Sequence, residues 1–140
     1  AFPRFSVWSL EGSMEIIQTS GVDSAVLVAD VYNLMAGKST AESMRKLGTK
    51  IGMIHVNDAP HRNHAELDVM YTRRFPGEGV LSPADWVRAA GDGGFDGPIS
   101  MEIFMKDLWE MDLNAAMRLC GDKAEQFATS LQPGWGEADR

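Results

Sequence analysis

The stretch Lys50-Ile-Gly-Met-Ile-His-Val-Asn-Asp-Ala-Pro60 decides the fold, because a short apolar run ends abruptly in polar, ionisable residues and a proline. The run Lys50–Val56 is typical of a buried strand. His55, Asn57 and Asp58 stand where that strand runs out. Parallel α/β enzymes build their sites from groups at the carboxyl ends of such strands, so this stretch predicts a strand and part of a site.

Three further runs predict strands on either side of this one. They are Phe5–Leu10, Ala25–Val31, which is nearly all apolar and is therefore expected to be buried on both faces, and Pro98–Phe104. Each strand is followed by a helical pattern with start and stop signals. The expected helices run from Gly12 to Gly21, from the capping box Ser39-x-x-Glu42 to Gly48, from the N-cap Ser82 to Gly91, and from Asp107 to Leu131. The order β-α-β-α-β-α-β-α predicts an α/β fold with a parallel sheet and right-handed crossovers.

The composition is that of one ordinary globular domain. The chain has 140 residues, of which 44% are hydrophobic and 24% charged, so we expect a single domain over residues 1–140 with an irregular tail at 132–140. A net charge of −7 argues against nucleic acid or an anionic membrane as the partner. No apolar run approaches the roughly 20 residues of a membrane span. The lone Cys120 excludes an internal disulfide, which suits a reducing compartment, and we expect a cytoplasmic protein.

Asp30, His55 and Glu102 are the candidate metal ligands. Each lies at or near the end of a predicted strand, and the carboxyl ends of parallel strands meet on one side of a sheet. Two carboxylates and an imidazole suit a divalent cation such as Mn²⁺, Mg²⁺, Co²⁺ or Zn²⁺. Such an ion would stabilise the enediolate formed when a proton is removed next to a carbonyl, and Glu102 is the candidate base.

Each of the three residues also has a structural interpretation. A lone Asp after a strand usually caps a turn or helix, and a lone strand-end His is usually hydrogen-bonded within the fold. Glu102 is harder to explain in this way, because a buried acid is unfavourable unless it is paired or bound to a metal. The repetition at three of four strands favours a site.

Four motifs occur in a characteristic order along the chain. They are Val28-Ala-Asp-Val-Tyr-Asn33, Ile54-His-Val-Asn-Asp-Ala-Pro60, Arg73-Arg-Phe-Pro-Gly-Glu-Gly-Val80 and Gly94-Phe-Asp-Gly-Pro-Ile-Ser-Met-Glu-Ile-Phe104. This set resembles the xylose isomerase-like TIM-barrel superfamily and, more narrowly, its sugar phosphate isomerase/epimerase group. The resemblance implies a (β/α)₈ barrel with a divalent metal at its C-terminal mouth. It also implies isomerase or epimerase activity on a sugar or sugar phosphate, with inosose dehydratase-like chemistry as a close variant.

The resemblance also implies residue roles. Asp30, His55 and Glu102 match three of the four metal ligands, and Glu102 matches the carboxylate that shuttles the substrate proton. Arg73 is similar to the arginine that contacts substrate oxygens. Asn33 stands where the family usually has histidine; it can hydrogen-bond a substrate hydroxyl, but it cannot ionise near neutral pH.

The length of the chain departs from that of the family. A full barrel takes about 250 residues, and the four βα units here correspond to its second half. The fourth metal ligand, a glutamate, would lie in the other half. Because a half barrel leaves sheet edges and interior surface uncovered, we expect a homo-oligomer or association with the missing barrel half.

Two other functions compete with the metal-dependent isomerase. A non-catalytic or partial scaffold that binds without turnover is favoured by Asn33 and by the half length. An apurinic-site endonuclease shares the barrel, but the net charge of −7 and the count of three histidines argue against it.

Overall fold

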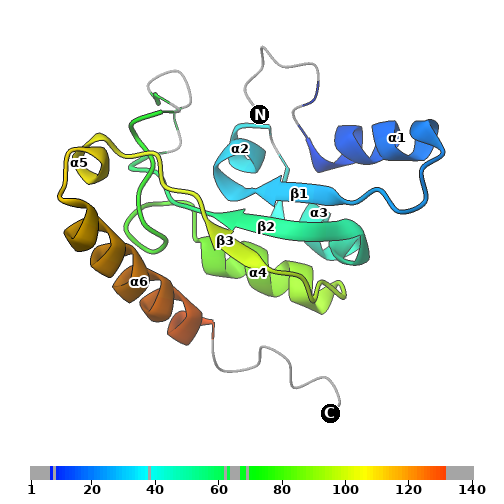
Figure 1. The fold of residues 1–140 in the computed structure, drawn as a ribbon. Helices are drawn as coiled ribbons and strands as arrows, with labels where there is room; N and C mark the ends of the chain where they lie inside the picture. The colour runs from blue at the N-terminus through cyan, green and yellow to red at the C-terminus, as the bar shows by residue number, and fades with distance from the viewer. Residues whose placement is uncertain are drawn as a thin grey trace.

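A three-stranded parallel sheet lies at the centre of the protein (Figure 1). The computed structural model describes residues 7, 9–37, 39–61, 63, 67–68 and 70–131. The strands are β1 (Leu27–Asp30), β2 (Ile51–Val56) and β3 (Ile99–Met101), in the order β1-β2-β3. The predicted α/β fold class with a parallel sheet is confirmed.

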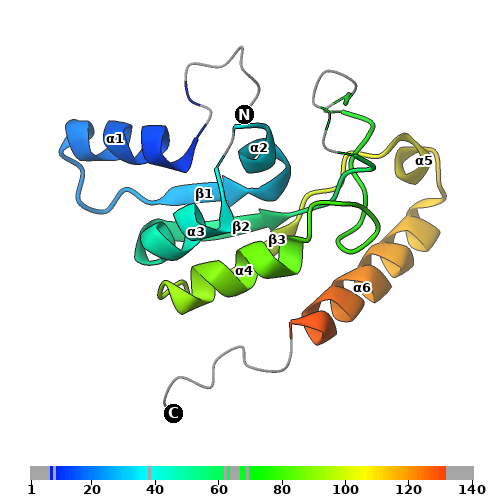
Figure 2. The ribbon, with the colours of Figure 1, turned by 180° about the vertical axis from the view of Figure 1, so that it is seen from behind.

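Helices surround this sheet unevenly. They are α1 (Leu10–Ser20), α2 (Val31–Ala36), α3 (Ala41–Leu47) with a 3₁₀ turn η1 (Gly48–Lys50), α4 (Pro83–Asp92), α5 (Lys106–Trp109) and α6 (Leu113–Ser130). Helices α3 and α4 pack side by side on one face of the sheet, which lies in front of them in Figure 1 and behind them in Figure 2. In the part of the chain that the structure describes, no helix covers the opposite face (Figure 1).

The two faces of the sheet differ accordingly in burial. On the helix-covered face Leu27, Ala29, Ile54 and Val56 are buried in the hydrophobic core. On the open face the Val28 side chain is 60% exposed. The prediction that the strand Ala25–Val31 is buried on both faces is therefore wrong for this chain, because no described element covers the second face.

Two glycines allow α3 and α4 to approach closely. A Cβ at Gly93 would lie 1.9 Å from the carbonyl oxygen of Arg45, and one at Gly48 would lie 2.5 Å from backbone atoms of Gly93. Only hydrogen fits at these positions. The close contact packs both helices against the core that supports β2.

The start of the chain differs from the expectation. Leu10, the last residue of the predicted strand Phe5–Leu10, belongs to α1, and most of that run lies outside the described residues. The Ser9 side chain accepts a hydrogen bond from Gly12 N and so caps α1. Gly21 ends α1 in the left-handed conformation, as predicted.

The second predicted helix has a different cap. Thr40 is the N-cap of α3 and forms a reciprocal capping box with Ser43, so the predicted box Ser39-x-x-Glu42 is wrong. Ser39 instead accepts a hydrogen bond from Leu10 N through its hydroxyl at 3.1 Å. The Ser39 side chain therefore binds the backbone at the start of α1 and does not cap α3.

The second half of the chain also shows differences. Ser82 precedes Pro83 with φ of 53° and makes no side-chain cap bond, so its predicted capping role is wrong although Pro83 does begin α4. The predicted strand Pro98–Phe104 is only three residues long. The expected helix Asp107–Leu131 is divided, because Asp112 caps a new helix by accepting from Ala115 N at 3.1 Å.

Two further expectations concern the tail of the chain and membrane-spanning helices. The tail at 132–140 lies outside the described residues. Among the helices of the described residues, each is too short or too polar to cross a lipid bilayer.

Candidate metal centre

Asp30, His55 and Glu102 converge at the carboxyl ends of the three strands. Asp30 and His55 are register partners in β1 and β2, and Glu102 follows β3, donating from its N–H to Val56 O at 3.2 Å. His55 Nδ1 lies 3.9 Å from Asp30 Oδ2 and 3.5 Å from Glu102 Oε2. One nitrogen or oxygen atom from each of the three residues lies within 4.8 Å of the others. The predicted convergence of the three side chains is thus present in the structure.

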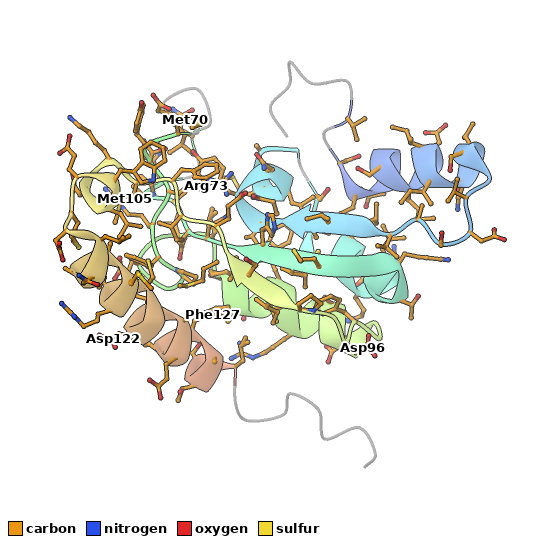
Figure 3. All side chains as sticks on the ribbon, in the orientation of Figure 1. Met70, Arg73, Asp96, Met105, Asp122 and Phe127 are labelled. Atoms are coloured by element: carbon orange, nitrogen blue, oxygen red, sulfur yellow. The ribbon has the colours of Figure 1, made fainter. Side chains whose placement is uncertain are left out.

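Arg73 joins this group from a loop far along the chain. Its Nη1 donates to Asp30 Oδ2 at 2.8 Å and to Glu102 Oε2 at 2.7 Å. Figure 3 places Arg73 beyond the carboxyl ends of the strands, between α2 and the segment that leads into α5. The side chain is only 2% exposed. The residue predicted to contact substrate therefore forms ion pairs with two predicted metal ligands in this structure.

Asp30 has the capping role considered from the sequence, and its second carboxylate oxygen faces the cluster. Its Oδ1 accepts from Asn33 N at 3.0 Å, so Asp30 is the N-cap of α2. Its Oδ2 faces Arg73 and His55. Asn33 is thereby held in the first turn of α2, next to the site. The cap fixes the orientation of the carboxylate, since one oxygen is bound to the backbone and the other points to the cluster.

Asn57 is hydrogen-bonded to the site, a contact that the sequence interpretation missed. Its side chain is fully buried, and its Oδ1 accepts from Tyr32 N at 2.9 Å. Its Nδ2 donates to Asp30 Oδ1 and to Glu102 O, both at 3.4 Å. The signal was present, because a side-chain amide that follows a buried strand must find partners inside the fold.

Asp58 organises the loop that carries Arg73. Its carboxylate accepts from the backbone N–H groups of Ala59 at 2.9 Å, Gly77 at 3.0 Å and Leu81 at 2.8 Å. Its backbone also pairs with Arg74 in an isolated antiparallel bridge. Asp58 therefore orients the backbone of the residues around it.

Other histidine, arginine and aromatic residues of the sequence lie beside the cluster, away from it or outside the described residues. His61 Nδ1 accepts from Asn63 N at 3.3 Å. Trp8, Arg62 and His64 fall on residues that the structure does not describe. The ring centre of Phe104 lies 4.6 Å from Arg73 Cζ, so this aromatic side chain lies beside the site.

The two carboxyl groups have different proton affinities. Burial raises the pKa of Asp30, but the charge of Arg73 and the hydrogen bonds from Glu102, Asn33 and Arg73 together hold it below the usual value. Burial raises the pKa of Glu102, and so do its hydrogen bond to Asp30 and the Asp30 charge, while Arg73 and His55 only partly offset them. Glu102 therefore has the higher proton affinity of the two carboxylates, which makes it the better base.

The donor set fits a divalent cation. It offers two carboxylate oxygens and one imidazole nitrogen, which are ligands of Zn²⁺, Mn²⁺ and similar ions. Three protein donors leave further coordination positions for water or substrate, as in catalytic sites. The residues present thus match the chemistry of a metal centre.

A parallel α/β unit with ionisable groups gathered at the strand carboxyl ends is typical of TIM barrels and of other parallel α/β enzymes. The sequence profile of the family described as "Xylose isomerase-like TIM barrel" matches residues 2–128. The chain belongs to the xylose isomerase-like TIM barrel family.

Two curated relatives, each from a different bacillus, share one name. The chain is 26% identical over 117 residues to "Inosose isomerase" of Bacillus subtilis (strain 168), a match that covers 83% of this chain and 42% of the relative. It is 24% identical over 124 residues to "Inosose isomerase" of Bacillus velezensis, covering 88% and 44%. This chain thus spans less than half the length of both relatives.

Solved structures show the same fold. The crystal structure described as "IOLI protein with a binding zinc atom" superposes with a TM-score of 0.83 at 23% identity, covering 94% of this chain and 47% of that one. A protein from Sinorhizobium meliloti 1021 gives a TM-score of 0.72 at 23% identity, covering 86% and 43%. The chain therefore corresponds to about half of a TIM barrel.

Proposed function

We propose that this chain is part of a divalent-metal-dependent isomerase or epimerase that acts on a sugar, a sugar phosphate or a keto-cyclitol. The observation that carries the proposal is the convergence of Asp30 Oδ2, His55 Nδ1 and Glu102 Oε2 at the strand ends. The isomerase names of the relatives and the zinc in a structural neighbour support it. The cytoplasmic location stays a prediction.

Asp30, His55 and Glu102 are the proposed metal ligands. Mn²⁺, Mg²⁺, Co²⁺ and Zn²⁺ all accept this donor set. A bound ion would polarise the substrate carbonyl and so acidify the neighbouring C–H group.

Glu102 is the proposed base. Its side chain is 31% exposed, so a substrate reaches it, and its raised pKa favours acceptance of a proton from the carbon next to the carbonyl. Transfer of that proton to the former carbonyl carbon, together with transfer of the neighbouring hydroxyl proton to the former carbonyl oxygen, gives the isomer. Delivery of a proton to the opposite face of the first carbon, by a second group, gives the epimer. Asn33 and Arg73 are the proposed contacts for substrate oxygens.

The site is proposed to be completed by another four βα units, supplied by the other half of a barrel or by a second copy of this chain. The open face of the sheet exposes Val28, and the relatives are more than twice as long as the matched region. Val28→Lys would leave the helix-packed core intact and disrupt association. Light scattering of the wild-type and variant chains tests this, and an unchanged mass for both at the monomer value would contradict self-association.

Metal analysis of the purified chain is the first test of the site. About one divalent ion per chain is expected, and His55→Ala should abolish it, whereas His61→Ala should leave it unchanged. Equal metal content in the wild type and His55→Ala would contradict the site.

Isomerase activity of the complete enzyme is the second test. We expect Glu102→Gln to lower kcat by at least about 10³-fold, since it removes the base, and Glu110→Gln on exposed surface to have no effect. Metal binding without turnover in the complete assembly would favour the alternative, a non-catalytic binding module.

A further inference from the structure

The Arg73 guanidinium contacts the same oxygen atoms that the proposed metal centre would use. Nη1 donates to Asp30 Oδ2 at 2.8 Å and to Glu102 Oε2 at 2.7 Å, and it also donates to Glu102 O at 3.2 Å. These two carboxylate oxygens are the ones that face His55 Nδ1. A positive charge thus already bridges two of the three ligands.

The position of this charge is fixed by its surroundings. Arg73 Cζ lies 5.0 Å from the ring centre of Tyr32 and 4.6 Å from that of Phe104, so the guanidinium lies between two aromatic rings. The side chain is almost completely buried, and its Nε is buried without a hydrogen-bond partner in the described structure. These contacts hold the guanidinium at the two carboxylates and keep it from swinging into solvent.

We propose that Arg73 is a built-in counter-cation of the metal centre, which holds Asp30 and Glu102 together before an ion binds and lowers the affinity of the site for that ion. The proposal rests on the proposed metal centre. The carboxylates of Asp30 and Glu102 lie close together, because both contact the same guanidinium nitrogen. Without Arg73 they would therefore repel each other. With Arg73 the three groups carry a net charge of about −1 in place of −2, so a divalent cation is attracted less strongly.

Arg73 has two opposing effects on the affinity of the site for a divalent ion, and the larger effect determines whether that affinity is raised or lowered. Arg73 preorganises the carboxylates, which favours ion binding, but it also repels the ion at close range. A divalent ion draws the carboxylates together by itself, whereas nothing relieves the repulsion while the guanidinium stays between its aromatic neighbours. The repulsion therefore dominates, and removal of the charge tightens metal binding.

Titration of the chain with Mn²⁺, followed by calorimetry, tests the proposal without any activity assay. Arg73→Met removes the charge and keeps an extended apolar side chain between the rings. We expect its Kd for Mn²⁺ to fall at least about tenfold, because a unit charge close to the ion is lost. Arg74→Met is the matched control: it is the next residue, its Nη1 contacts Met105 Sδ at 3.9 Å, and its Kd should stay within about twofold of the wild type.

The melting temperature of the metal-free chain provides a second test of the proposal. We expect Arg73→Met to melt at a lower temperature than the wild type in chelator, and Mn²⁺ to raise its melting temperature more than that of the wild type. If the variant is unfolded in chelator, Mn²⁺ must restore its helical circular dichroism, since the ion replaces the lost counter-cation. An unfolded variant that Mn²⁺ does not restore would overturn the proposal.

Other outcomes separate this proposal from the proposed function. Equal or weaker Mn²⁺ affinity in Arg73→Met would overturn the counter-cation role and leave the metal centre in place. Absence of His55-dependent binding in the wild type and in Arg73→Met would contradict the metal centre itself, and the counter-cation role with it.

Discussion

Asn57 and Asp30 are joined across adjacent strands by a hydrogen bond of 3.4 Å from Asn57 Nδ2 to Asp30 Oδ1. The same amide accepts from Tyr32 N and donates to Glu102 O, so it connects the ends of all three strands. Because Asn57 is fully buried, water does not replace these bonds. Asn57 thereby positions two of the proposed ligands without being one.

We expect Asn57→Ala to lower the free energy of unfolding by about 2–3 kcal/mol, because it leaves the buried Tyr32 N–H without its acceptor. It should also weaken metal binding by about tenfold, since outer contacts orient the ligands. Urea denaturation and metal titration measure the two effects. Asn114→Ala, on the exposed surface of α6, is the control and should change neither quantity. Unchanged metal affinity in Asn57→Ala would show that Asp30 is oriented by α2 alone.

The stability of the metal-free chain should depend on pH through Glu102 and Asp30 in opposite ways. The pKa of Glu102 is raised above 4.5, mainly by burial, so between that value and its folded-state pKa the folded chain holds a proton that the unfolded chain has lost. Glu102 therefore makes the free energy of unfolding fall as pH rises through this interval. The pKa of Asp30 is lowered below 3.8, because Arg73 and its hydrogen bonds outweigh burial, so its stabilisation is lost as pH falls through that lower pKa.

Glu102→Gln should accordingly remove the decline above pH 4.5 and retain the loss of stability in acid. Urea denaturation in chelator between about pH 3 and pH 8 gives both profiles. Profiles of the variant and the wild type that run parallel above pH 4.5 would contradict the elevated pKa.

Asp58 should be essential for the order of the loop between β2 and α4. Asp58→Ala leaves three backbone N–H groups without their acceptor, at Ala59, Gly77 and Leu81, and we expect a loss of about 3 kcal/mol or more. Hydrogen exchange should show faster exchange at the Gly77 and Leu81 amides. Asp96→Ala, an exposed control, should leave exchange unchanged at these amides. Slow exchange at both amides in Asp58→Ala would mean that other contacts order the loop.

Local patterns predicted the strand β2 and the three polar strand ends well, since the pattern of apolar and polar residues that marks a buried strand extends over only a few residues. Helix caps were less predictable: Ser39 and Thr40 are adjacent potential caps, and the hydrogen bond that the Ser39 hydroxyl accepts from Leu10 N leaves Thr40 to cap α3. The role of Arg73 depends on contacts with Asp30 and Glu102, which are 43 and 29 residues away. No local pattern specifies such contacts, so burial of that arginine became evident only in three dimensions.

The contact between α3 and α4 gives a prediction that is independent of the metal. Gly93→Ala would place a methyl group 1.9 Å from Arg45 O, which is backbone and cannot rotate away. Since φ of Gly93 is −90°, alanine tolerates the backbone conformation and the effect is purely steric. We expect a loss of about 2–4 kcal/mol, because α4 must shift away from α3.

Gly121→Ala is the matched control, since a Cβ there meets nothing within 4 Å and the residue lies inside α6. It should raise the stability by about 0.5–1 kcal/mol, the difference in helix propensity between the two residues. Thermal unfolding of both variants measures these opposite shifts. A Gly93→Ala chain as stable as the wild type would mean that α3 and α4 have room to separate, and the close packing behind β2 would then not be needed to hold His55 in place.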